Sequence, residues 1–463
     1  MKKLLIAAVA AAFVLNASLA LAGTGAVKLP PYKESKLENG LRVFVMETTE
    51  VPLVTVALLV PSGSAADGPG AEGVANLTGR LLLKGAGGMT AEQIAEAIEE
   101  VGGDMRVNTT RDYTAVFANF MAKDLERALD ILSKAVLAPA FPAEELAREK
   151  SLVAAEIAGT KDNPMALASR EAVRVLVGDH AYAHAVSGSP ASVNGMPREG
   201  VLAFHKANYV PAGAIVAVVG NVKSAKALDL VKARFGSWKG AAPAREIPAL
   251  EPRKFPGRTV FVVDKKDATQ SQIRIGNVAV PRNTPDYFPL VVSNTVLGGG
   301  FTSRLMNEIR VNRGLSYGAR SGVTHMKHGG IFTVMTYTKN KTMREAVDVC
   351  LNELKKLRDE RIGDEELTGN KKYISGLFPF DIETNNDLAG WLVDLTYNGV
   401  PLTFIEEYQG KVASVTPDDC MRVARAHYWL DDNLIFLMTN YDETKEQLQG
   451  LGNVEVVGID KIE

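Results

Sequence analysis

Apolar residues gather in short runs, and these runs recur in the same order in two stretches of the chain. In each stretch two apolar segments of strand length come first, and a longer segment with helical spacing follows. These segments are Arg42–Met46, Val54–Val60 and 72–84 in the first stretch, and Thr259–Val263, Gln272–Val280 and 287–298 in the second. Strands mixed irregularly with long helices predict an α+β fold in which helices cover a largely antiparallel sheet.

The later parts of the two stretches correspond as well. Each is predicted to contain a strand pair, a helix, and a last helix followed by an apolar strand. The first helices lie near Asp124–Val136 and Met343–Arg358, and the apolar strands that end the two halves are Ala214–Val219 and Leu434–Met438.

Short motifs also repeat at nearly one spacing. Glu144-Glu145-Leu146 recurs as Glu365-Glu366-Leu367, 221 residues later, and Ala191-Ser192-Val193 recurs as Ala413-Ser414-Val415, 222 residues later. We therefore predict two homologous halves, 23–238 and 257–463, joined by a linker over 239–256 that contains four prolines. Two such halves can face each other across a cavity, and clefts between domains are frequent binding sites.

The first 22 residues have the features of a secretory signal peptide. Lys2 and Lys3 precede an apolar run, Leu4–Leu15, and Ala20-Leu21-Ala22 forms a small-x-small cleavage site. The alternative is an uncleaved membrane anchor, but the apolar run is short for a membrane span. We expect residues 1–22 to be removed and the mature protein to be periplasmic, without a membrane segment.

Composition excludes several classes of protein. The chain has 463 residues, of which 46% are hydrophobic and 23% charged, as in ordinary globular proteins. The 52 basic and 54 acidic residues nearly balance, so nothing marks a nucleic-acid binder. The cysteines, Cys350 and Cys420, are too few for a cysteine-ligated zinc domain. A bridge between them is permitted in the periplasm, but both lie in helix-like segments, which favours two buried thiols.

Several short motifs resemble, in their order, the pitrilysin/insulinase-type zinc peptidases, a family that includes the mitochondrial processing peptidases. In the first half these are Leu37-Glu38-Asn39-Gly40-Leu41, Gly73-Val74-Ala75, Lys84-Gly85 and Asp162-Asn163-Pro164. In the second half they are Leu297-Gly298-Gly299-Gly300, Ser303-Arg304-Leu305 and Arg313-Gly314-Leu315-Ser316-Tyr317. The resemblance covers nearly the whole mature chain. It implies two α+β halves that enclose a peptide-binding cavity.

The chain departs from this family at the metal site. Family catalysis uses an H-x-x-E-H helix, in which the histidines ligate zinc and the glutamate takes a proton from the zinc-bound water. The resemblance places Asn76, Gly79 and Arg80 at these three positions, Glu156 at the third zinc ligand, and Glu149 two helical turns earlier. Asparagine is a poor zinc ligand, glycine accepts no proton, and arginine repels a cation. We expect no metal here, and an ion pair of Arg80 with Glu156 in the place of zinc.

Elsewhere the sequence offers no complete catalytic site of its own. The triple glycine, Gly298-Gly299-Gly300, is not followed by Gly-Lys-Ser/Thr, so it is not a phosphate loop. No serine or cysteine stands in a nucleophile motif. The histidines are expected to be surface or structural residues; they are His180, His184, His205, His325, His328 and His427.

The second half keeps a different feature of the family, an arginine and a tyrosine seven residues apart. The matching residues are Arg310 and Tyr317, which the resemblance places opposite the zinc, in contact with substrate. A phenol can donate a hydrogen bond to a scissile carbonyl, and a guanidinium can hold a carbonyl or carboxylate. The structural alternative is that Arg310 caps a helix or pairs with Glu308, while Tyr317 packs at the start of a strand.

An arginine–tyrosine pair without a zinc motif resembles the non-catalytic subunit of heterodimeric members of this family. The resemblance implies a homologous zinc-bearing partner, a chain that is inactive alone and holds no cofactor itself, and peptide substrates bound in an extended form. The rival hypothesis is a catalytically inactive peptide-binding or scaffold protein of the same fold, and a third is an autonomous peptidase with a rewired metal site.

Overall fold

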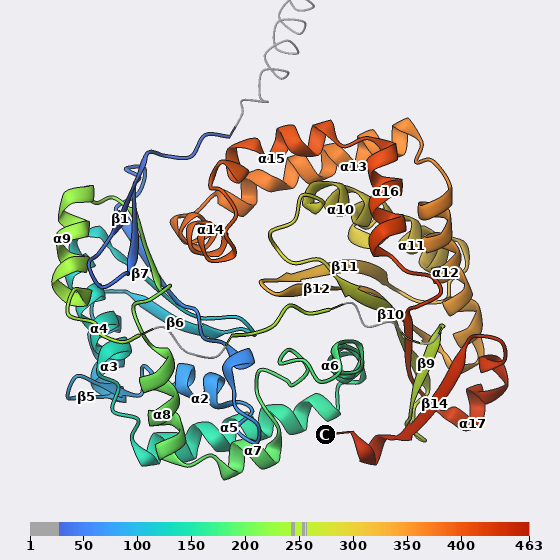
Figure 1. The fold of residues 1–463 in the computed structure, drawn as a ribbon, viewed down its shortest axis with the longest axis horizontal. Helices are drawn as coiled ribbons and strands as arrows, with labels where there is room; N and C mark the ends of the chain where they lie inside the picture. The colour runs from blue at the N-terminus through green and yellow to red at the C-terminus, as the bar shows by residue number, and fades with distance from the viewer. Residues whose placement is uncertain (1–26, 242–245, 252–254, 256, 463) are drawn as a thin grey trace, which may run out of the picture.

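The computed structural model describes residues 27–241, 246–251, 255 and 257–462, so the predicted signal peptide lies outside the described residues. Two six-stranded sheets confirm the predicted α+β fold (Figure 1). The first sheet has the order β1-β2-β8-β3-β7-β6, formed by β1 (Tyr32–Lys36), β2 (Arg42–Glu47), β3 (Leu53–Val60), β6 (Asp104–Thr109), β7 (Thr114–Met121) and β8 (Ile215–Gly220). The second has the order β11-β12-β10-β13-β9-β14, formed by β9 (Thr259–Asp264), β10 (Gln270–Ala279), β11 (Ala319–Met326), β12 (Gly329–Lys339), β13 (Leu434–Thr439) and β14 (Asn453–Gly458).

The two sheets correspond strand by strand when one order is reversed, so that β6 matches β11 and β8 matches β13. The prediction that each half ends at an apolar strand was wrong. Helix α9 (Ser224–Phe235) follows β8, while α17 (Tyr441–Thr444) and β14 follow β13. The edge opposite β6 is the antiparallel strand β1, but its counterpart β14 comes from the C-terminal segment and runs parallel to β9. Strand β14 forms this edge of the second sheet. The sequence did not predict it, because its apolar run is short.

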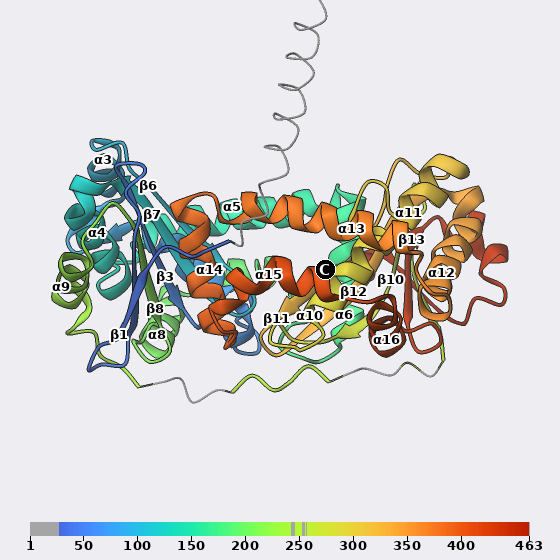
Figure 2. The ribbon, with the colours of Figure 1, turned by 90° about the horizontal axis from the view of Figure 1, so that it is seen from above.

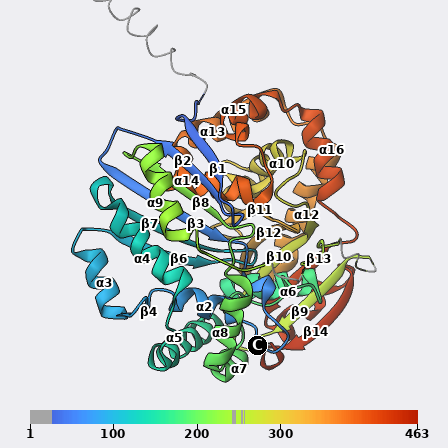
Figure 3. The same cartoon turned by 60° about the vertical axis from the view of Figure 1, so that its left-hand side comes forward.

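Helices cover the outer face of each sheet, as the predicted layers require (Figure 3). On the first sheet they are α2 (Val74–Leu81), α3 (Ala91–Glu99), α4 (Leu125–Leu137), α5 (Ala143–Lys161), α7 (Pro190–Gly195), α8 (Arg198–Asn208) and α9. On the second they are α10 (Tyr287–Asn294), α11 (Arg304–Met306), α12 (Met343–Asp359), α13 (Asp364–Leu377), α15 (Thr403–Ser414) and α16 (Pro417–His427). Cys350 in α12 and Cys420 in α16 are buried free thiols, and burial raises the pKa of each to about 12.

Two helices cross from one half to the inner sheet face of the other. Helix α6 (Pro164–Val177) packs Leu167 and Leu176 against the second sheet, and α14 (Asn385–Asn398) packs Leu388 and Leu392 against the first (Figures 1 and 2). The central strands are therefore buried on both faces, which explains why β8 and β13 are apolar at nearly every position. This exchange joins the halves through two hydrophobic cores.

The tips of two β-hairpins also meet between the halves. Asp112, in the β6–β7 turn, accepts hydrogen bonds from the Tyr182 hydroxyl and from the backbone N–H of Lys327, in the β11–β12 turn, at 3.0 Å for the latter. The Tyr397 hydroxyl of α14 donates to the Asp112 carbonyl at 3.1 Å, and the Lys327 ammonium donates to the Tyr397 carbonyl. Each hairpin tip is thus fixed by residues of both halves.

Of the described part of the predicted linker, Gly240 lies against Val210 of the first half, whereas the later described residues pack on the second half. Leu250 is buried, and its backbone N–H donates to the His328 carbonyl at 2.6 Å. Phe255 is buried beside the second sheet as well. Among the residues that the structure describes, no helix combines the length and apolar character needed to cross a membrane.

Candidate functional site

Helix α2 carries the degenerate metal motif, and a buried carboxylate fixes its start. Gly73 adopts the left-handed conformation (φ 93°) that lets the chain turn into the helix. The Asp67 carboxylate accepts the N–H groups of Gly73 at 2.7 Å and Ala75 at 3.0 Å, and it lies 3.2 Å from Nε2 of His184. Burial raises the pKa of Asp67, although these hydrogen bonds oppose the shift. The structural role expected for His184 is confirmed, whereas the sequence analysis missed Asp67, seven residues before the first residue of the helix.

Arg80, at the end of α2, occupies the position of the second histidine and joins two carboxylates of α5. Its Nε donates to Glu149 at 2.7 Å, and its two terminal nitrogens bind both oxygens of Glu156 at 3.1 and 2.9 Å. Lys84 lies 3.5 Å from Glu149, whose side chain is only 5% exposed. Partial burial lowers the pKa of Arg80, but the hydrogen bonds from its guanidinium to both glutamates outweigh this and raise it. The predicted pairing of Arg80 with Glu156 is confirmed, and a fixed cation neutralises both acidic positions.

The position of the general base is closed by packing. A Cβ atom at Gly79 would lie 2.5 Å from Oγ1 of Thr109 on β6, closer than van der Waals contact allows. Thr109 is held by Thr114, since their hydroxyl oxygens are 3.1 Å apart. A side chain at position 79 therefore requires at least the Thr109 hydroxyl to move away. Asn76 lies one turn before Arg80 on the same helix. Within the described residues, no group of three or more His, Cys, Asp or Glu side chains is placed to hold a metal, and this site does not fit zinc.

Arg310 and Tyr317 lie in the second half and expose their polar groups. Arg310 is in the short π-helix η4 (Asn307–Asn312), with its guanidinium carbon 4.7 Å from the centre of the Phe301 ring. Tyr317, in the loop before β11, is 82% exposed, so it does not pack at the strand start. Glu308 pairs with Arg313 at 3.4 Å rather than with Arg310. The pairing of Arg310 with Glu308 and the packing of Tyr317 are therefore wrong, while the role of both residues toward substrate stays a prediction.

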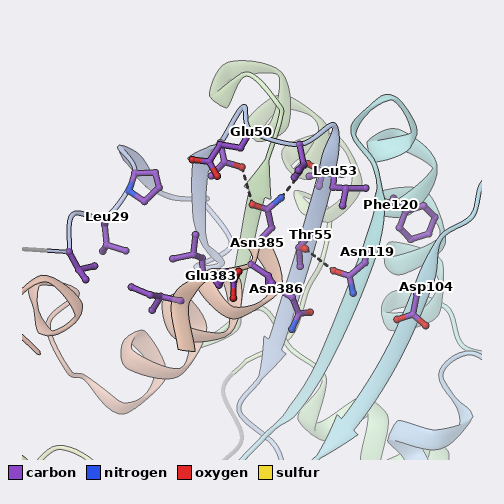
Figure 4. Close-up of a pocket in the computed structure, with 18 of the residues that line it drawn as sticks. Leu29, Glu50, Leu53, Thr55, Asp104, Asn119, Phe120, Glu383, Asn385 and Asn386 are labelled. Atoms are coloured by element: carbon purple, nitrogen blue, oxygen red, sulfur yellow. Dashed lines mark hydrogen bonds between the residues drawn. The ribbon is translucent and has the colours of Figure 1, made fainter. Parts of the chain in front are cut away.

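A cavity of about 730 Å³ lies at one end of the first sheet, between the segment 27–30, strands β3, β6 and β7, and the start of α14 (Figure 4). Asn385 of α14 accepts a hydrogen bond from Thr48 at 2.9 Å and donates to the Leu53 carbonyl at 3.4 Å. Thr55 donates to Asn119 at 2.7 Å across the inner sheet face. The sequence analysis missed this cavity, because only the crossing of α14 brings residues 337 positions apart together.

One edge strand of each sheet lies near a candidate site residue: β6 near Gly79 in the first sheet, and β11 near Tyr317 in the second. Strand β6 is the last strand of the first sheet and packs beside α2 through Val107 and Thr109, which face Gly79. Strand β11 is the last strand of the second sheet and begins two residues after Tyr317. An edge strand has one row of backbone N–H and C=O groups with no partner in its sheet, and an extended peptide can pair with that row.

Comparison with known proteins identifies the fold and the family. The chain matches the family model described as insulinase (peptidase family M16) over residues 42–187, and the model described as peptidase M16 inactive domain over 196–373. A protein of Mycobacterium leprae described as an uncharacterized zinc protease is 30% identical over 354 residues, covering 76% of this chain and 79% of that protein.

Solved structures agree with these matches. A peptidase M16 inactive domain from Pseudomonas fluorescens superposes with a TM-score of 0.83 and 26% identity, covering 88% of this chain and 97% of that one. The periplasmic protease PqqL of Escherichia coli shares the fold with a TM-score of 0.74 and 17% identity, over 91% of this chain and 49% of that one. Two sheets of corresponding order, the altered helix α2 and these similarities lead to one conclusion: the chain belongs to peptidase family M16, the insulinase family.

Proposed function

We propose that this protein is the non-catalytic subunit of a periplasmic heterodimeric zinc peptidase. A homologous partner with an intact H-x-x-E-H motif would supply the zinc and its activated water. This chain would bind peptides or unfolded proteins in an extended form and contribute contacts to the reacting group. It would be inactive alone.

The observation that carries the proposal is the ion cluster of Arg80, Glu149 and Glu156. A guanidinium held by three hydrogen bonds fills the place of the metal, and Gly79 leaves no proton acceptor beside it. The second observation is that the family's arginine and tyrosine positions in the opposite half keep exposed polar groups. Arg310 and Tyr317 present such groups, and among the described residues neither side chain has a hydrogen-bond or ion-pair partner.

The roles proposed for the two side chains follow from their chemistry. The Tyr317 hydroxyl would donate a hydrogen bond to the scissile carbonyl oxygen as negative charge develops on it. The Arg310 guanidinium would hold a backbone carbonyl or a carboxylate of the same peptide. The edge strands β6 and β11 give such a peptide two places to pair in an extended form.

The proposal includes the arrangement of the chain. Residues 1–22 would be a cleaved signal peptide, 23–238 and 257–463 two peptidase-like domains, and 239–256 their linker. The buried side chains of Leu250 and Phe255 support a linker that is anchored to the second half.

The decisive experiment purifies the mature chain from its native periplasm and measures bound zinc and cleavage of an unstructured fluorogenic peptide. We expect a zinc-bearing relative to co-purify and activity to require the complex. In that complex, Tyr317→Phe should lower turnover by about tenfold or more without changing assembly, because one transition-state hydrogen bond is lost. Tyr373→Phe, at another exposed tyrosine of the second half, is the matched control.

Other results would decide against the proposal. Stoichiometric zinc and cleavage by the lone chain would establish an autonomous peptidase. A homodimer that never engages a zinc-bearing relative would establish the peptide-binding or scaffold protein. Unchanged turnover of the Tyr317→Phe complex would remove the role of that phenol.

A further inference from the structure

The short loop 314–318, between η4 and β11, carries Tyr317. It begins at Gly314, whose left-handed backbone (φ 60°) turns the chain away from η4. Because the Tyr317 side chain is 82% exposed, the backbone of the loop decides where its phenol points. The contacts of that backbone are therefore the contacts that position the phenol.

Two buried threonines of β12 bind the loop on either side of Tyr317. The Thr338 hydroxyl donates to the Leu315 carbonyl at 2.8 Å, and the Thr336 hydroxyl donates to the Gly318 carbonyl at 2.9 Å. These threonines are 1% and 3% exposed, and their spacing of two places them on the same face of the strand. The carbonyls two residues before and one residue after Tyr317 are thus both attached to the sheet.

Leu315 extends this attachment to Arg310. Its backbone N–H donates to the carbonyl of Ile309, the fully buried residue before Arg310, at 2.8 Å. Its carbonyl is the one that Thr338 holds. The Thr342 hydroxyl lies 2.7 Å from that of Thr338 and can donate to it, which leaves the Thr338 proton for Leu315. One set of hydrogen bonds therefore fixes the arginine and the tyrosine segments relative to each other.

Packing alone does not call for hydroxyl groups at positions 336 and 338. Valine has nearly the shape of threonine and suits a strand equally well, whereas a buried hydroxyl costs free energy unless it is hydrogen-bonded. Both hydroxyls find a partner in the loop. Ser316 adds only long bonds within the loop itself, to the N–H of Gly318 at 3.3 Å and to its carbonyl at 3.2 Å.

We propose that Thr336 and Thr338 are positioning residues for Tyr317, which fix the loop so that the phenol is held in one orientation before a peptide binds. This inference deepens the proposed function and rests on it. A hydrogen bond that forms as charge develops stabilises a transition state most when its donor is already in place. An exposed side chain gains such preorganisation only through its backbone.

The first test measures the mobility of the phenol in the full mature chain, without any partner. With 3-fluorotyrosine at position 317 alone, the width of its fluorine resonance reports how freely the side chain moves. The double variant Thr336→Val/Thr338→Val should narrow this line by about twofold, because the loop is released. Thr336→Ser/Thr338→Ser keeps both hydroxyls and should keep the parent width. Thr333→Val, on the other face of β12, is the matched control and should also leave the line unchanged.

The second test measures peptide cleavage by the complex with the zinc-bearing partner. The double valine variant should lower kcat about tenfold and change KM by less than about twofold, since only the transition-state contact is lost. When Tyr317→Phe is already present, the same double variant should cause no further loss. A general loosening of the fold would lower kcat in both backgrounds, so this comparison separates positioning from stability.

Three results overturn the positioning role. They are a fluorine line that stays broad in the double valine variant, a line that narrows as much in Thr333→Val, and a loss of kcat that keeps its full size beside Tyr317→Phe. Failure of the proposed function is a different result, in which no zinc-bearing partner co-purifies or Tyr317→Phe leaves turnover unchanged. In that case the fluorine line of the lone chain still decides whether the two threonines hold Tyr317.

Discussion

In the first half, the charged side chains at the positions of the degenerate metal motif are paired with each other. Arg80 lies between Glu149 and Glu156, and on α6 the buried Glu171 lies between Arg170 at 3.0 Å and Arg174 at 2.7 Å. In the second half, Arg310 has only an aromatic neighbour and the Asp381 carboxylate has no partner among the described residues.

The contrast is sharpest between the two helices that cross. On helix α6 the buried Glu171 pairs with both Arg170 and Arg174. The buried Arg274 of β10 donates to the Met165 carbonyl and the Ser169 hydroxyl of the same helix. Helix α14 presents Asp387 and Asp394 toward a cavity. Two halves of one plan have thus been adapted differently. In the first half, ion pairs neutralise the charged residues at the degenerate metal motif, whereas in the second half Arg310 has no ion pair among the described residues.

The largest change in the free energy of unfolding should come from substitutions in the two cores that the crossing helices α6 and α14 form with the opposite sheets. Leu392→Ala in α14 and Leu176→Ala in α6 each remove a fully buried side chain from the core under the opposite sheet. Each should lower the free energy of unfolding by about 3 kcal/mol. Because each helix packs on the other half, urea unfolding of either variant, followed by fluorescence and circular dichroism, should still show one transition.

Leu377→Ala is the control, since that side chain is 45% exposed and should cost less than about 1 kcal/mol. Two separate transitions in either core variant would show that the halves unfold independently, and the crossing helices would then not couple them.

A smaller change in the free energy of unfolding should distinguish Arg80, which is in an ion cluster, from Arg310, which has no ion pair among the described residues. Arg80→Met leaves the buried Glu149 with only Lys84 at 3.5 Å, and should lower the free energy of unfolding by about 2 kcal/mol. Arg310→Met removes no ion pair and should change it by less than about 0.5 kcal/mol. Both changes in the free energy of unfolding are to be measured by urea titration at pH 7.

The double variant Arg80→Met/Glu149→Gln tests the cause of that difference. Replacing the unpaired Glu149 carboxylate by an amide should recover about half of the lost free energy of unfolding, because a buried amide costs less than a buried unpaired carboxylate. Equal stability of the two single variants would mean that the ion cluster contributes nothing to the fold.

Much of this could be predicted from the sequence, for reasons specific to each element. The strands β2 and β9 were found from continuous apolar runs, and Arg80 was placed opposite Glu156 because both positions belong to an ordered set of family motifs. The crossing of α6 and α14 was not found. Leu388 and Leu392 show that α14 has an apolar face, but local spacing does not say which of two sheets that face covers. The sequence analysis missed three aspartates for the same reason, because tertiary contacts determine their partners or neighbours. They are Asp67, Asp112 and Asp381.

The smallest predicted effect concerns Asp381 and Asp394, two carboxyl groups that line a cavity beside α14. Burial, with Asp387 nearby, raises the pKa of Asp381, and burial likewise raises that of Asp394. A carboxyl group with a raised pKa in the folded protein destabilises the fold when it is ionised, so this penalty is present at pH 7 and disappears as the pH falls through the folded pKa. Asp381→Asn should therefore give a slightly higher thermal midpoint than the parent at pH 7, and the two midpoints should converge as the pH falls below the ordinary pKa of an aspartate. The paired first half offers the control: Glu156→Gln breaks the ion pair with Arg80 and should lower the midpoint at pH 7. A lower midpoint for Asp381→Asn would mean that the folded protein already neutralises this carboxylate.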